Sequence, residues 1–220
     1  MKHTEKELKE LKTHHIEMWN LVQNQVSKAF DALRRADKEL AREVIARERI
    51  VNAQELVVDH HCENFIALFA PVAIDLRFVI ALLKITNNLE RIGDFAKGIA
   101  GFVLYRQNKP MDADLFARLQ LEAMMTTSEK MLQMAREALI NEDSVLCGKV
   151  LNMDDSIDRI NEQVVPVMAD YISNNSVAIQ ETMYLYAVIR RIERIGDRVS
   201  NIAEDIVFFV DAKELRHQKK

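Results

Sequence analysis

The pentapeptide Glu-Arg-Ile-Gly-Asp occurs twice in this chain, at residues 90–94 and 193–197, so the copies lie 103 residues apart. The apolar positions around it repeat at the same offset, in steps of four and three. They are Ile85, Leu89, Ile92, Ala96, Ile99 and Val103 in the first copy, and Val188, Ile192, Ile195, Val199, Ile202 and Ile206 in the second. This spacing places one apolar stripe on one side of an α-helix. An internal duplication therefore predicts two similar halves, each with a long helix that carries the same core face.

The composition favours helices and argues against several classes of protein. With 5 Gly and 3 Pro in 220 residues, the chain has few residues that break helices. The net charge of −4 argues against a nucleic-acid-binding protein, which needs a clustered basic surface. No apolar run approaches the roughly 20 residues that span a membrane. Cys62 and Cys147 form no C-x-x-C motif, and the polar N-terminus does not resemble an export sequence, so we expect a cytoplasmic protein with reduced thiols.

The same plan of three helices is predicted in each half. Asp37 and Asp143, which lie 106 residues apart, have the side chain that caps a helix N-terminus. Pro71 ends the second helix, and Pro166 predicts a kink within the fifth. The expected helices cover about 5–35, 38–69, 72–105, 112–140, 143–174 and 177–210.

These helices predict an all-α fold of two tandem antiparallel three-helix bundles, one repeat in 1–107 and the other in 111–220. The stretch Gln107-Asn108-Lys109-Pro110 is the best linker in the chain. Because this linker is short, we expect the two halves to pack together. One continuous array of six helices is the alternative.

Each copy of the motif places a glutamate and an aspartate four residues apart. Residues at i and i+4 are neighbours on a helix, so Glu90 and Asp94 can bind one ligand, as can Glu193 and Asp197. Oxygen-only ligands suit hard cations such as Mg²⁺, Mn²⁺ or iron. If the apolar stripe faces the core, these carboxylates point away from it, which predicts a site at the protein surface.

Other helices offer further oxygen ligands at matching places in the two halves. Asp154 with Asp158 forms another i, i+4 pair, and Glu48 with Asn52 stands 106 residues earlier. Together with the repeated motif, such pairs would allow a shared or multinuclear metal site.

The alternative is that these acids lie on an ordinary solvated helix face, neutralised by arginine. Arg190 and Arg194 each stand three residues before an acid of the second pair. The glycine inside each copy of the motif argues for a site, because a mid-helix glycine costs about 1 kcal/mol relative to alanine. Close approach of another helix or a ligand at Gly93 and Gly196 would account for that cost.

Other candidate sites are weaker. The run Asp59-His60-His61-Cys62-Glu63 cannot direct all its side chains at one ion, because successive helical residues point about 100° apart. A ferritin-like di-iron centre is disfavoured, because it needs a Glu-x-x-His motif on each of two helices and the chain has a single such sequence, Glu214 to His217. No glycine-rich phosphate loop or nucleophile with its base is present. Neither an organic cofactor nor enzyme activity is predicted.

The chain resembles the PhoU family of phosphate-signalling regulators. The resemblance rests on the doubled motif, on the preceding APVAIDLR with Asp75 and Arg77, and on the later RVSNIAEDIVFFV, and it extends from about Met18 to Val210. It implies two three-helix bundles, a homodimer, and clusters of metal ions such as iron on Glu/Asp-x-x-x-Asp motifs. It also implies a negative regulator that connects a phosphate ABC transporter to a sensor histidine kinase at the membrane.

Carried over position by position, the resemblance assigns a set of metal ligands to this chain. They are Glu90, Asp94, Asp154, Asp158, Glu193, Asp197, Asn201 and Glu204. The first half departs from the pattern, because Gly98 and Gly101 stand where the second half has Asn201 and Glu204, and Asn52 stands where it has Asp158. We therefore expect the first site to bind metal more weakly or not at all.

The expected function is regulation of phosphate uptake and phosphate-starvation signalling by binding partners, with iron, Mn or Mg ions at the carboxylate motifs. Two alternatives remain. One is a metal-dependent hydrolase with a multinuclear carboxylate site, and the other is an accessory subunit of another phosphate transporter.

Overall fold

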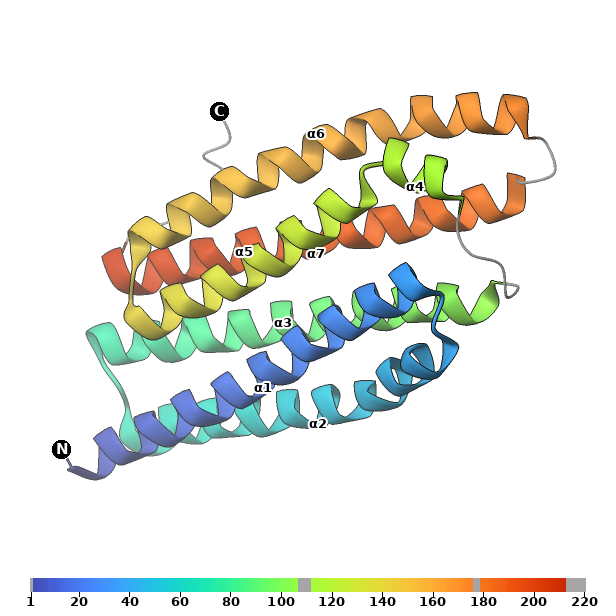
Figure 1. Cartoon of the computed structure of the whole chain (residues 1–220). Helices are drawn as coiled ribbons and strands as arrows, with labels where there is room; N and C mark the ends of the chain where they lie inside the picture. The colour runs from blue at the N-terminus through green and yellow to red at the C-terminus, as the bar shows by residue number, and fades with distance from the viewer. Residues whose placement is uncertain (1, 107–111, 176–178, 213–220) are drawn as a thin grey trace.

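The computed structural model describes residues 2–106, 112–175 and 179–212, and all the regular secondary structure in these residues is α-helical. The first half contains three long helices (Figure 1). They are α1 (Lys2–Arg35), α2 (Lys38–Phe69) and α3 (Ala73–Tyr105). The second half contains one short helix and three longer ones. They are α4 (Ala113–Arg118), α5 (Leu121–Asn141), α6 (Ser144–Asn174) and α7 (Ile179–Asp211).

Aspartates cap the helices at the predicted places. The Asp37 carboxylate accepts hydrogen bonds from the backbone N–H groups at 39 and 40, and Asp143 accepts one from the N–H of residue 146. Asp112 caps α4 in the same way. The helix α6 continues through Pro166. The predicted linker at 107–110 and the start of the last helix at residue 177 lie outside the described residues.

The structure corrects one helix of the prediction. The helix expected over 112–140 is broken into α4 and α5 at Gln120, which adopts a left-handed conformation with φ of 51°. Leu119 and Leu121 are both almost fully buried, although two such positions would point about 200° apart on a straight helix. The break turns both leucines inward, and apolar spacing alone does not predict a two-residue break at 119–120.

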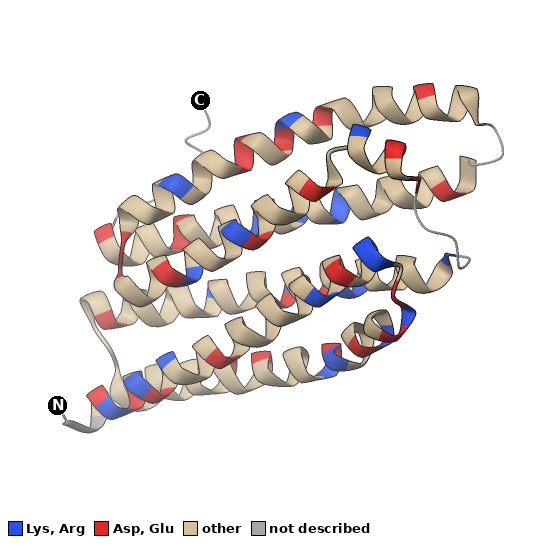
Figure 2. Ribbon diagram, in the orientation of Figure 1, with Lys and Arg blue, Asp and Glu red and all other residues tan. Residues whose placement is uncertain are grey.

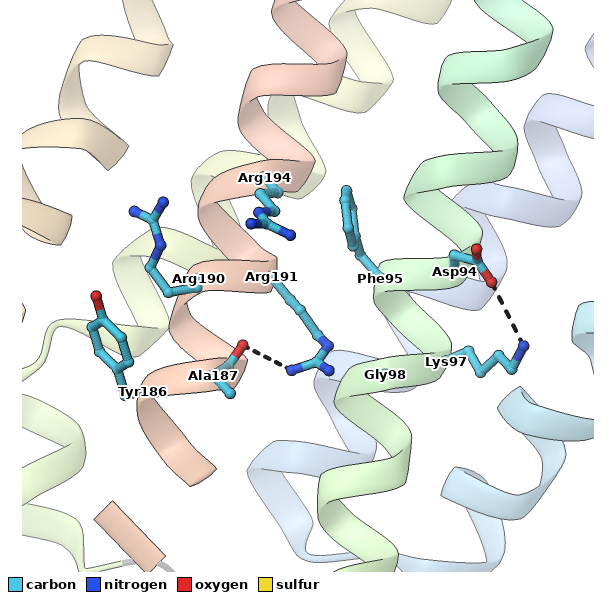
Figure 3. Close-up of a pocket in the computed structure, with 9 residues that line it drawn as sticks. All are labelled: Asp94, Phe95, Lys97, Gly98, Tyr186, Ala187, Arg190, Arg191 and Arg194. Atoms are coloured by element: carbon cyan, nitrogen blue, oxygen red, sulfur yellow. Dashed lines mark hydrogen bonds and ion pairs between the residues drawn. The ribbon is translucent and has the colours of Figure 1, made fainter. Parts of the chain in front are cut away.

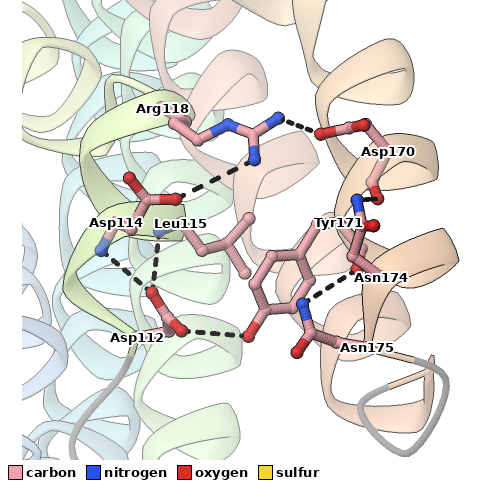
Figure 4. A network of polar contacts seen from close by, with 8 residues as sticks. All are labelled: Asp112, Asp114, Leu115, Arg118, Asp170, Tyr171, Asn174 and Asn175. Carbon is pink, nitrogen blue, oxygen red and sulfur yellow. Dashed lines mark hydrogen bonds and ion pairs between the residues drawn. The ribbon is translucent and has the colours of Figure 1, made fainter.

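The short helix α4 is held against the C-terminal part of α6 by polar contacts (Figure 4). Arg118 Nη2 lies 2.6 Å from Asp170 Oδ2, and the Tyr171 hydroxyl donates to Asp112 Oδ2 over 3.2 Å. Leu115 packs into the core beside them. The chain therefore enters the second bundle along α6 before it turns into α5.

The two halves form two three-helix bundles that pack side by side. α1, α2 and α3 contact one another, as do α5, α6 and α7, and the bundles meet where α3 packs on α7 and α1 packs on α5 (Figure 1). This arrangement confirms the predicted duplicated fold. Acidic and basic residues are mixed along each long helix (Figure 2).

The repeated apolar stripe forms the centre of the core. All twelve of its positions, six in α3 and six in α7, are buried. Trp19 and Phe30 fill the first bundle from α1, and Cys62 and Cys147 are buried free thiols. No helix in the described part of the chain is long and apolar enough to cross a membrane.

Candidate metal centre

The first cluster of carboxylates lies between α2 and α3. Glu48 of α2 meets Glu90 and Asp94 of α3, and each contributes one oxygen to a group whose members all lie within 4.8 Å of one another. Glu90 and Asp94 belong to the predicted pair. Glu48 completes the group from the neighbouring helix.

Two side-chain amide groups donate hydrogen bonds to the Glu48 carboxylate. Gln25 Nε2 donates to Glu48 Oε2 over 2.6 Å, and the Asn52 amide, turned so that its nitrogen faces the acid, donates to Oε1 over 3.0 Å. Asn52 therefore acts here as a donor to Glu48. The sequence identifies Asn52 only as the residue that stands where the second half has Asp158.

The second cluster lies at the matching place between α6 and α7. Asp158 of α6 meets Glu193 and Asp197 of α7, again with oxygens within 4.8 Å of one another. The two Glu193 oxygens differ. Oε1 accepts a hydrogen bond from Arg190 Nη1 over 3.1 Å, as the sequence spacing predicted, whereas Oε2 is buried with no hydrogen-bond partner among the described residues.

The other assigned ligands lie around this second cluster without joining its three carboxylates. Asp154 is one turn from Asp158 on α6, and its Oδ2 accepts a hydrogen bond from Ser200 over 2.8 Å. Its Oδ1 is buried without a partner in the described structure. Asn201 and Glu204 are half-buried on the following turns of α7.

The glycines of the motif lie where the partner helix comes closest. A Cβ on Gly196 would stand 2.7 Å from Asp154 Oδ1 and 3.0 Å from Ile157 Cδ1. A Cβ on Gly93 would stand 3.3 Å from Gln25 Oε1 and from Val51 Cγ1. The prediction of close helix approach at both glycines is confirmed.

The partner helices cover only part of each cluster. Glu48 and Glu193 are only 4% and 9% exposed, because they lie where α2 packs on α3 and α6 packs on α7. Glu90 and Asp94 are half-buried, whereas Asp158 and Asp197 are exposed, so both clusters open to the protein surface. The sequence offers Glu48 as an oxygen ligand for a shared site, and the covering helix determines which carboxylates it joins. A glutamate 42 residues before the motif becomes its neighbour only when the bundle closes.

Burial raises the pKa of the three glutamates in the clusters, Glu48, Glu90 and Glu193. It is the main cause of the raised pKa of Glu90 and of Glu193, and the neighbouring aspartate of each motif raises both further. Burial also raises the pKa of Glu48, partly offset by the hydrogen bond from Gln25. The pKa of Asp154 rises to about 6 for the same reason. Such acids are stabilised either by protons or by a cation.

The donor set fits a hard metal ion. Each cluster provides three carboxylates and no sulfur or imidazole, which suits Mg²⁺, Mn²⁺ or iron rather than a soft metal. The second cluster fits better, because it has a buried carboxylate oxygen that lacks a partner. By contrast, Asp59 and Glu63 share a side of α2 but join neither cluster.

The model of one protein family, the PhoU domain, matches the chain twice, over residues 16–103 and 121–206. Among relatives, the phosphate-specific transport system accessory protein PhoU of Serratia marcescens is 32% identical over 214 residues, which are 96% of this chain and 86% of the relative. A homologue named for the same system from Thermotoga maritima is 26% identical over 97% of this chain and 91% of its own length.

The solved structures agree with this match. The crystal structure of PhoU from Pseudomonas aeruginosa superposes with a TM-score of 0.90 at 29% identity, covering 95% of this chain and 99% of that one. The phosphate transport system regulatory protein PhoU from Streptococcus pneumoniae gives a TM-score of 0.82 at 25% identity, over 96% and 99% of the two chains. Because the family model matches both halves and together covers most of the residues, this chain belongs to the PhoU family.

Proposed function

We propose that this protein is a cytoplasmic regulator of phosphate uptake and phosphate-starvation signalling. In this role it restrains a sensor histidine kinase when phosphate is ample and connects it to a phosphate ABC transporter. The relatives named for the phosphate-specific transport system support the transport part of this role. The observation that carries the proposal is the pair of matching carboxylate clusters, one in each half of a chain of this family.

Metal ions bound at these clusters would tie helices together. A cation between Asp158, Glu193 and Asp197 would join α6 to α7, and the unpartnered Glu193 oxygen supports this site as the stronger one. Asp154, Asn201 and Glu204 extend it along the helices toward a second ion. The first cluster would bind more weakly, because the Gln25 and Asn52 amides already hold Glu48.

The protein would act by binding partners, as a homodimer, and not by catalysis. The competing function is a metal-dependent hydrolase at the same carboxylates. Phosphatase assays with Mn²⁺ or Fe²⁺ separate the two, because turnover that disappears in a Glu193→Gln variant would favour the hydrolase.

The regulatory role is tested by deletion of the gene. In rich phosphate, we expect the deletion strain to express phosphate-starvation genes that the wild type keeps silent. The wild-type gene on a plasmid should restore silence. Silent starvation genes and unchanged phosphate uptake in the deletion strain would contradict the proposal.

The metal site is tested by elemental analysis of the purified protein and of two matched double variants. Glu193→Gln with Asp197→Asn removes two carboxylates of the second cluster, so we expect most of the bound metal to be lost. Asp59→Asn with Glu63→Gln removes another i, i+4 pair on α2 that joins neither cluster, so metal content should stay at the wild-type level. Equal metal content in all three proteins would refute the assigned ligands.

A further inference from the structure

A basic groove runs between α3 and α7, beside the carboxylate clusters (Figure 3). Its volume is about 550 Å³, within the roughly 300–1,000 Å³ typical of small-molecule sites. Its charged lining consists of four cations and one acid: Lys97, Arg190, Arg191, Arg194 and Asp94.

Two of the four cations are already paired with carboxylates. Lys97 Nζ lies 3.6 Å from Asp94 Oδ1, and Arg190 donates to Glu193. Arg191 Nη1 donates to the backbone carbonyl of Ala187 over 3.0 Å, and neither Arg191 nor Arg194 forms an ion pair with a described residue. Two guanidinium groups in the groove therefore keep their charge and most of their N–H donors.

These two arginines are held close to each other. They stand three residues apart on α7, so they are neighbours on one face, and both side chains extend toward α3, where Phe95 and Gly98 lie opposite (Figure 3). Arg191 packs directly on Gly98, since a Cβ at that position would overlap its Nε and Cδ atoms. The absent side chain at Gly98 is what lets Arg191 lie across the groove.

The duplication provides an internal comparison for this arrangement. At the offset of 103 residues, the place of Arg191 in α7 is taken by Asn88 in α3, and the place of Gly98 is taken by Asn201. At the equivalent positions of the same two helices, with α3 and α7 exchanged, asparagine therefore stands in both places and no arginine is opposite a glycine. The fold alone does not require Arg191 at this position.

We propose that this groove binds a phosphate-type oxyanion, either free or carried on a small molecule, through Arg191 and Arg194. Planar guanidinium groups donate two parallel N–H bonds to such an anion, which a single lysine does not. Lys97 adds positive charge from the wall formed by α3. This inference depends neither on a metal at the carboxylate clusters nor on the proposed regulatory role.

The test is calorimetric titration of the metal-free full-length protein at low ionic strength. Inorganic phosphate and ATP are titrated separately, so that a free anion and a nucleotide-borne one are distinguished. We expect saturable binding of at least one of them. Arg191→Gln and Arg194→Gln should each weaken it about tenfold or more, because each removes charge-assisted hydrogen bonds.

Arg159→Gln on α6 is the matched control. Arg159 also donates to the carbonyl four residues before it, as Arg191 does, but it is exposed outside the groove. Its replacement should leave affinity unchanged. Because Arg194 is exposed, its variant should keep the wild-type melting curve, so that a loss of binding is not a loss of fold.

Two results would overturn the proposal. One is the absence of saturable binding for both phosphate and ATP. The other is an affinity that is the same in the Arg191→Gln, Arg194→Gln double variant as in the wild type.

Discussion

At the scale of single residues, glycine shows how closely the helices of each bundle pack. Gly196 faces Asp154 and Ile157 at distances that leave no room for a methyl group, whereas Gly101, also in a helix interior, has no neighbour within 4 Å of an added Cβ. Both glycines carry the same backbone cost in a helix. Only Gly196 is required by its surroundings.

We therefore expect opposite effects from alanine at these two positions. Gly196→Ala should lower the free energy of unfolding by about 1–2 kcal/mol, because overpacking outweighs the gain in helix propensity. Gly101→Ala should raise it by about 0.5–1 kcal/mol. Urea denaturation in the presence of a chelator measures both, and a Gly196→Ala variant as stable as Gly101→Ala would contradict the close packing.

His15 is a second residue whose role comes from its burial. It is fully enclosed in the first bundle, where its Nδ1 lies 3.2 Å from Thr86 Oγ1, and burial lowers the pKa of the imidazole from its ordinary value near 6.5 to about 3. The folded protein keeps this imidazole neutral where the unfolded chain protonates it. As the pH falls below 6.5, the unfolded state binds the proton and stability is lost.

The pH dependence of His15→Gln should show this difference. Between pH 6.5 and 4, the wild type should lose up to about 1.4 kcal/mol of stability per pH unit from this group, a slope that the variant lacks. Comparing unfolding free energies over this range isolates the effect. His60→Gln, at an exposed histidine of α2, should retain the wild-type slope; a His15→Gln variant with that slope would rule out the neutral imidazole.

At the scale of helices, aspartate caps explain where α2, α4 and α6 begin, whereas the start of α5 carries a backbone cost. Gln120 adopts a left-handed conformation between α4 and α5 and is exposed. That conformation costs an L-residue other than glycine about 1 kcal/mol or more. Burial of Leu119 and Leu121 on its two sides offsets this cost.

Glycine should accordingly stabilise the protein at this break and destabilise it nearby. We expect Gln120→Gly to raise the free energy of unfolding by about 0.5–1 kcal/mol, since glycine adopts positive φ without strain. Gln133→Gly, the same substitution at an exposed position inside α5, should lower it by about 1 kcal/mol. Thermal and urea unfolding measure both changes; a loss of stability in Gln120→Gly would mean that α4 and α5 form one helix in solution.

At the scale of the whole molecule, the two repeats share a buried seam. The rings of Phe78 in α3 and Phe209 in α7 lie 4.9 Å apart, and Lys84 Nζ reaches the buried Asp205 carboxylate at 3.6 Å. Arg106 donates to Glu181 at one end of the seam. A repeat separated from its partner would expose all these groups.

We predict that the repeats 1–107 and 111–220 do not reach full stability alone. Each should melt well below the intact chain, because the apolar faces of α3 and α7 lose their cover. An equimolar mixture should recover much of the helical signal and elute as a complex, as followed by circular dichroism and size-exclusion chromatography. A separated repeat that melts at the temperature of the full chain would disprove this coupling.

The sequence by itself determined the helical fold, its duplication, the aspartate caps and the repeated acid pairs. These features depend on side chains a few residues apart, whose spacing on a helix follows from its 3.6-residue period. Only the tertiary structure decided that Glu48 joins Glu90 and Asp94, that Ser200 hydrogen-bonds Asp154, and that Arg191 lies across Gly98. Each of these contacts joins two helices, and their relative position depends on how whole apolar faces pack, which no local spacing specifies.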